Sequence, residues 1–249
     1  MRKILLVIAI IVLVTIQSCS IHTETLLHKN AEATTEMNID FREMMGLMMG
    51  MVPDSVDAKS QFSELNKLPT EWTSLYDFEK KERKKLTTDP DSVRLMKKMF
   101  LKANLENGEI VGISLKQDHF SAKDYEFIDK GDAKDKMPLN NKIFQSWDGK
   151  TLTIDTKNFT DQDYKKIGAS AGSAEPSKDG EQDMMTKMMQ IDITNIIKFE
   201  TKIKSITGLH DWVQKVDDRT IKITYSSKQL ADSQLKFKNE DAQIVVVTE

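Results

Sequence analysis

The 249-residue chain contains a single cysteine, Cys19. One cysteine excludes an internal disulfide and a zinc site built from several cysteines. Basic and acidic residues nearly balance, 36 against 39, so the chain lacks the basic excess that is typical of nucleic-acid binding. It also lacks repeats and has only one long apolar run, which excludes a polytopic membrane protein. We therefore expect no nucleic-acid partner.

The one apolar run lies at the N-terminus. It follows Arg2 and Lys3, spans residues 4–14 and ends shortly before Ser18-Cys19. A positive start, a short apolar segment and a small residue before a cleavage point are typical of a secretory signal peptide. A membrane-spanning helix would need roughly 20 apolar residues, and this run is shorter.

The segment Ile16-Gln17-Ser18-Cys19 resembles the lipobox of bacterial lipoproteins, in a form tolerated in Bacteroidota. In that family the signal peptidase cuts before a cysteine whose thiol carries a diacylglycerol. The resemblance implies that residues 1–18 are removed, that Cys19 is lipidated, and that the lipid holds the protein to a membrane. The alternative is an uncleaved anchor with an unmodified thiol, for which the apolar run is short.

The residues after Cys19 bear on its destination. No aspartate follows it, which by resemblance to sorting in enteric bacteria implies the outer membrane, and no acidic run of the kind associated with surface export follows either. We therefore expect the periplasmic face of the outer membrane. Losing Arg2 and Lys3 with the signal leaves 34 basic and 39 acidic residues. A polybasic lipid-binding patch is thus absent, and the acyl chains must provide the anchoring.

Hydrophobic periodicity predicts strands towards both ends of the mature chain and helices in its middle. The predicted helices are 42–51, 54–67, 70–86 and 90–105, and Asp89 is expected to cap the last of them before Asn107-Gly108 ends it. The predicted strands are 24–28, 36–41, 109–117, 124–128, 143–147, 151–156, 189–205, 220–226, 234–239 and 242–248. We expect one α+β domain over residues 19–249, with an antiparallel sheet of N- and C-terminal strands and helices packed on one face.

The C-terminal part of the chain carries a second resemblance. Gly208, Asp217-Asp218 and the run Thr220-Ile221-Lys222-Ile223 are similar to the strand-turn-strand ends of LppM-like bacterial lipoproteins. The resemblance covers about a quarter of the chain. It implies an envelope lipoprotein and brings no active site with it.

Methionine is unusually frequent, with 14 residues. Eight of them form two copies of the pattern Met-Met-x-x-Met-Met: Met44, Met45, Met48, Met49, Met184, Met185, Met188 and Met189. Flexible thioether side chains fill irregular cores and build adaptable apolar surfaces, and they are also soft ligands that select Cu(I). Three interpretations stay open: core packing, an apolar surface that faces a ligand or membrane, and a copper site.

Other motifs have more ordinary explanations. Ser170 lies in the G-x-S-x-G pattern of serine hydrolases, with Asp192 and His210 following in hydrolase order, but the pattern needs a preceding apolar strand and a following helix. Here it lies in a polar loop rich in small residues. The four histidines have no zinc-binding spacing, and the aspartates around 129–135 do not follow a calcium-loop pattern.

These observations favour a non-enzymatic, lipid-anchored envelope lipoprotein that needs no cofactor. It would bind another envelope protein, a different envelope component or a small apolar ligand. The alternative is a periplasmic Cu(I) carrier that uses the methionine motifs.

Overall fold

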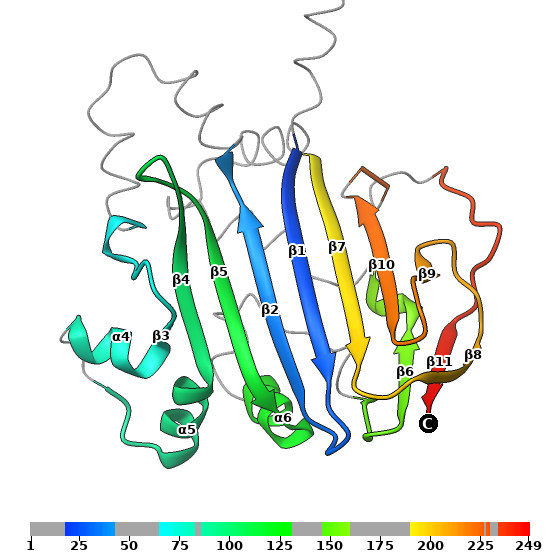
Figure 1. The fold of residues 1–249 in the computed structure, drawn as a ribbon, viewed down its shortest axis with the longest axis horizontal. Helices are drawn as coiled ribbons and strands as arrows, with labels where there is room; N and C mark the ends of the chain where they lie inside the picture. Colours follow the sequence, from blue (N-terminus) through cyan, green and yellow to red (C-terminus); the bar gives the residue numbers. More distant parts are fainter. Residues whose placement is uncertain are drawn as a thin grey trace, which may run out of the picture.

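The computed structural model describes residues 18–42, 65–82, 86–130, 146–159, 190–226, 228–229 and 234–249. Within them, an eight-stranded sheet has the order β3-β4-β5-β2-β1-β7-β10-β9, and a three-stranded sheet has the order β6-β11-β8 (Figure 1). The large sheet is formed by β1 (Ser18–Leu27), β2 (Ala33–Asp40), β3 (Thr73–Ser74), β4 (Met99–Glu106), β5 (Glu109–Phe120), β7 (Gln190–Phe199), β9 (Val213–Lys215) and β10 (Thr220–Ser226). The small sheet is formed by β6 (Thr151–Asp155), β8 (Ile203–Thr207) and β11 (Gln243–Thr248).

Three helices accompany these sheets in the described part of the chain: α4 (Leu75–Lys81), α5 (Pro90–Lys98) and α6 (Ala122–Lys130). Short 3-10 turns cover Leu65–Lys67 and Thr156–Phe159. The α+β prediction is confirmed, because N-terminal β1 and β2 share the large sheet with C-terminal β7 and β10. All neighbours in that sheet are antiparallel except β1 and β7, which are parallel and bring the two halves of the chain together.

The core lies on one face of the large sheet. Because side chains alternate along a strand, every second residue of the central strands points to this face, and those on β1 are fully buried. Residues from α5, α6 and both sheets complete the same cluster: Ile21, Leu27, Met37, Leu95, Phe120, Tyr125, Ile128, Leu152, Ile154, Ile193, Ile197, Ile223, Ile244 and Val246. The other face is largely polar and carries the alternate residues, such as Glu24, Glu36 and Lys198.

The helix predicted over 90–105 was right at its start and wrong at its end. Asp89 caps α5, since its carboxylate accepts the Ser92 N–H at 2.8 Å. The helix ends at Lys98, and the following residues form β4. Val93, Met96, Met99 and Phe100 fit helical spacing, yet Met99, Leu101 and Ala103 also alternate, and pairing with β5 decides the outcome.

The strand predicted over 124–128 was also wrong, because these residues lie in α6. Ser121 precedes this helix, and the Asp124 carboxylate accepts the Ser121 N–H at 2.9 Å, which is one of the two bonds of a capping box. The predicted strand 234–239 is absent. Of the predicted strand 143–147 only residues 146–147 are described, and they form no strand. The segment predicted as one strand over 189–205 contains two, β7 and β8. The predicted helix 70–86 is reduced to α4, preceded by the short strand β3. The predicted helix 42–51 beyond residue 42, and most of 54–67, lie outside the described residues.

Candidate functional site

Cys19 is the second residue of β1, close to the centre of the large sheet. In register it pairs with Ile191 of β7, and the next residue, Ser20, pairs with Asp40 of β2 and Asp192 of β7. The lipidation candidate therefore adjoins folded structure directly, with no flexible tether between. We call this end of the sheet the anchor edge and define it by Cys19, Ser20, Asp40, Arg42 and residues 105–109.

Ion pairs stabilise the anchor edge. The Arg42 guanidinium contacts the Asp40 carboxylate and lies 2.9 Å from Glu106 at the β4–β5 turn. The Arg42 side chain holds the pKa of Asp40 below its usual range, mainly through this hydrogen bond. These contacts join β2 to the turn between β4 and β5 across the outer end of the sheet.

The methionine motifs lie outside the described residues, but the strands that connect to them are described. β2 ends at Asp40, four residues before Met44, and β7 begins at Gln190, immediately after Met189. Both strands flank β1 at the anchor edge. Two strand spacings separate them, about 10 Å. Both motif-bearing segments therefore connect to the sheet beside Cys19.

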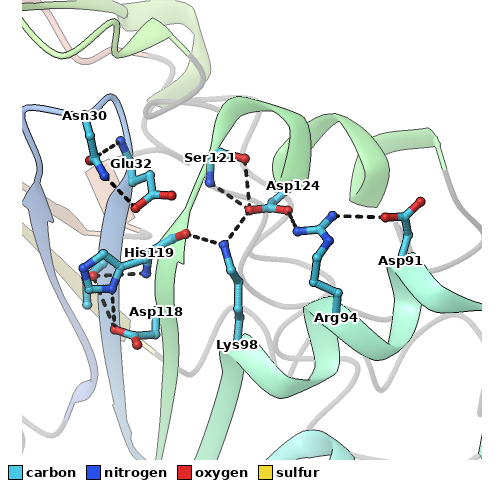
Figure 2. A network of polar contacts seen from close by, with 10 residues as sticks. Asn30, Glu32, Asp91, Arg94, Lys98, Asp118, His119, Ser121 and Asp124 are labelled. Carbon is cyan, nitrogen blue, oxygen red and sulfur yellow. Dashed lines mark hydrogen bonds and ion pairs between the residues drawn. The ribbon is translucent and has the colours of Figure 1, made fainter.

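The opposite end of the sheet carries a polar network that no sequence motif predicts. We call it the polar end: His28, Thr34, Asp118, His119 and Glu200. His28 is buried, with Nδ1 2.9 Å from Glu200 and Nε2 2.9 Å from the Thr34 hydroxyl. Its ring stacks on His119, with centroids 4.5 Å apart and an interplanar angle of 10°. The His119 ring in turn lies 3.2 Å from Asp118 (Figure 2).

The order carboxylate, imidazole, hydroxyl at the polar end is also that of a catalytic triad. Here, however, the hydroxyl of Thr34 additionally accepts the backbone N–H of His119 at 3.2 Å. The Glu200 carboxylate likewise accepts the backbone N–H of Lys29 at 2.8 Å. Thr34 and Glu200 thus join the β1–β2 turn to the ends of β5 and β7, and we interpret the network as one that stabilises this end of the sheet.

A second network connects the polar end to α5 and α6. Lys98 donates to the His119 carbonyl at 2.6 Å and to Asp124 at 3.1 Å, and Arg94 also pairs with Asp124 (Figure 2). Asp124 is only 1% exposed. Burial by itself raises the pKa of Asp124, but the bonds from Ser121, Arg94 and Lys98 lower it by more. A charged carboxylate thus binds the two helices together.

The hydrolase candidates do not converge in the described part of the chain. Ser170 lies outside it, and Asp192 lies at the anchor edge, in register with Ser20 and Ser226. His210 is buried between aromatic rings, including Phe159, Trp212 and Phe237, and its Nδ1 accepts the Trp212 N–H at 3.2 Å. Burial lowers the pKa of His210. This histidine therefore packs in a core.

One buried polar group stands out on the core face. Asn195 of β7 is 5% exposed and lies in register with Thr23 of β1 and Ile223 of β10. Its amide nitrogen has no hydrogen-bond partner in the part of the protein that the structure describes. An unsatisfied buried donor is costly, so this position suits a water or ligand acceptor.

Membrane-spanning helices and metal-binding clusters are both absent from the described ranges. Among those residues, no helix combines the length and apolar character needed to cross a membrane. The same ranges contain no cluster of three or more His, Cys, Asp or Glu side chains that could hold a metal ion.

Comparison with known proteins returned one structure. No family model and no curated protein matches the chain. The NMR structure of the folded domain of Mycobacterium tuberculosis LppM matches this chain with a TM-score of 0.35 and 8% sequence identity. The match covers 94% of this chain and 92% of that chain.

Proposed function

We propose that the protein is a lipid-anchored, non-enzymatic lipoprotein on the periplasmic face of the outer membrane. It binds another envelope component or a small apolar ligand. The observation that carries the proposal is the position of Cys19. The chain's single cysteine follows a signal-like segment and is also the second residue of strand β1. Cleavage before it would remove only Ser18 from β1 and leave the rest of the strand attached to lipid.

The surroundings of His28 and His210 support a non-enzymatic role. The His28 ring contacts Glu200 and the Thr34 hydroxyl, and that hydroxyl also accepts the His119 backbone N–H. The His210 ring is buried and contacts Phe159, Trp212 and Phe237. A general base needs a nitrogen that can reach a substrate proton, and neither buried position favours this.

Support for a small ligand comes from the core face. Among the described residues the Asn195 amide nitrogen has no hydrogen-bond partner, and apolar side chains of β1, β7 and β10 share its face of the sheet. A mostly apolar environment with one polar group that fixes orientation is typical of small-molecule sites. Thr23 adds a hydroxyl on the same face of β1, whereas the Thr25 hydroxyl bonds with that of Thr35 at 3.0 Å.

Palmitate labelling tests the anchor. Cells that express the full chain should incorporate labelled palmitate into a processed product, whereas Cys19→Ala should give an unprocessed, unlabelled precursor. Ser20→Ala is the matched control, because Ser20 is the next residue and is exposed. It should mature and label normally. A Cys19→Ala protein that still labels would refute the proposal.

The alternative function is Cu(I) carriage by the methionine motifs. It is favoured by the connection of both motifs to the sheet on either side of β1. Met→Leu at Met44, Met48, Met185 and Met188 should then spare the fold and abolish Cu(I) uptake, since leucine has no sulfur donor. Under the packing interpretation, the same changes cost under about 1.5 kcal/mol each, and Met→Asp costs far more. An apolar surface would tolerate Met→Asp in the fold and lose its ligand. Thermal melts and a Cu(I) competition titration separate the three.

A further inference from the structure

We infer that the tip of the β4–β5 hairpin, residues 105–109, lies against the lipid surface beside the anchor, with Leu105 as its apolar contact. This inference rests on the proposed lipidation of Cys19 and deepens it by assigning the orientation of the domain. The partner is the headgroup region of a bilayer. Strand register, the exposure of Leu105 and the absence of a linker between Cys19 and β1 support this orientation.

Register places Leu105 and Cys19 at the same level. Ser20 pairs with Asp40, Asp40 pairs with Gly112, and Gly112 pairs with Asn104, so one row crosses four neighbouring strands. Cys19 is one residue further out on β1, and Leu105 is one residue further out on β4. Three strand spacings separate the two, about 14 Å.

The hairpin continues beyond that level. Glu106 pairs with Glu109, and Asn107-Gly108 forms the turn, with φ of 52° and 85°. Two consecutive residues at positive φ make a tight hairpin turn, for which Asn-Gly is the favoured sequence. The tip is therefore short and well defined, and the β4–β5 turn lies at the same end of the sheet as the start of β1 (Figure 1). A lipid attached to Cys19 brings this tip to the membrane.

Leu105 gives the tip an apolar contact. It is 48% exposed, one of three large hydrophobic side chains exposed in the described ranges. Its neighbours Glu106 and Glu109 are acidic, and the Arg42 guanidinium that pairs with Glu106 is shared with Asp40. The tip should therefore prefer zwitterionic lipids, because an anionic surface repels these carboxylates.

A lipidated protein cannot orient freely when its anchor lacks a linker. Cys19 already belongs to β1, so only the cysteine side chain and its glyceryl group separate the acyl chains from the sheet. The opposite end of the sheet then points away from the bilayer. Val216 lies at that opposite end, in the β9–β10 turn, where its N–H donates a hydrogen bond to the Thr220 carbonyl. Thr220 pairs with Lys198 of β7, and Lys198 pairs with Leu26 of β1, so Val216 and Leu26 lie at the same level. Leu26 is about 23 Å along β1 from Cys19.

Site-directed labelling tests the orientation. Lipidation consumes the thiol of Cys19, so Leu105→Cys introduces the sole free thiol of the lipidated chain. Val216→Cys is the matched control, because Val216 is also an exposed apolar residue, 54% exposed, in a hairpin turn. The full lipidated chain is labelled with an environment-sensitive fluorophore and reconstituted in phosphatidylcholine vesicles that contain lipids with a nitroxide near the headgroup. Glu109→Cys supplies a second position on the same tip.

We expect fluorescence quenching at positions 105 and 109 and none at 216, and we expect weaker quenching when phosphatidylglycerol is included. Equal quenching at all positions, or quenching at 216 alone, would overturn the orientation while leaving the anchor in place. Flotation of the vesicles checks the anchor separately. A chain that fails to float with vesicles would refute the proposed lipidation and this inference together, and circular dichroism confirms that each variant is folded.

Discussion

The junction of α5 and α6 offers the sharpest stability prediction, Asp124→Ala. Asp124 is 1% exposed and accepts bonds from the Ser121 amide at 2.9 Å, the Ser121 hydroxyl at 3.0 Å and Lys98 at 3.1 Å, besides its contact with Arg94. Removing one partner of a buried pair costs about 3–5 kcal/mol. The side chains of Arg94 and Lys98 are 43% and 29% exposed and can regain water, so we expect the lower end, about 3 kcal/mol.

Urea unfolding at pH 7 measures this cost, with Asp91→Ala as the matched control. Asp91 contacts the same Arg94 at 3.4 Å but is 61% exposed, so its removal should change the free energy of unfolding by under about 0.5 kcal/mol. The pKa of Asp124 is lowered in the folded state. Its stabilisation is therefore present above the unfolded pKa of about 4 and is lost as pH falls through the folded pKa. A cost below about 1 kcal/mol, or one equal to that of Asp91→Ala, would refute the reasoning.

Three further changes test other parts of the account. The hydrogen bond from His28 holds the pKa of Glu200 below its usual range, so Glu200→Gln should destabilise the protein at pH 7 by under about 1 kcal/mol, seen as a lower melting temperature. The effect should shrink at a pH low enough to protonate the wild-type carboxylate, and equal effects at both pH values would contradict this. Asn195→Leu removes a buried amide donor that has no partner among the described residues, so it should stabilise the ligand-free protein by about 1 kcal/mol in urea unfolding, and a loss of that size would contradict the assignment. At Gly149, φ is 95° and an added Cβ would lie 2.5 Å from a backbone oxygen, whereas at Gly108 φ is 85° and nothing lies within 4 Å. Thermal melts should therefore show that Gly149→Ala costs well over the roughly 1 kcal/mol expected for Gly108→Ala.

Local signals in the sequence identify much of the fold. Asp89 and Pro90 mark the start of α5, and the alternation of Ile221, Ile223 and Tyr225 predicts β10 with its observed bounds. The end of α5 could not be read locally, because Met99 and Phe100 fit both a helix and a strand. Pairing with β5 decides it, and that pairing joins residues across the Asn107-Gly108 turn.

The networks at the polar end were beyond local reasoning. His28 and His119 are far apart in the sequence, and Glu200 is farther still, so no spacing motif connects them. They meet because β2 pairs with β5 and β1 pairs with β7. The Asn-Gly turn was the one signal available for the hairpin tip, and interpreting it as a helix end concealed Leu105.

The mass of the N-terminal peptide of the mature protein decides whether the chain is cleaved before Cys19 and lipidated there. The account predicts a chain that begins at Cys19 and carries a thioether-linked diacylglycerol on that residue. Mild base treatment should remove the ester-linked acyl chains from the peptide and leave the glyceryl group attached to Cys19 through its thioether. A mature protein that retains residues 1–18, or one with a free thiol at Cys19, would contradict the account.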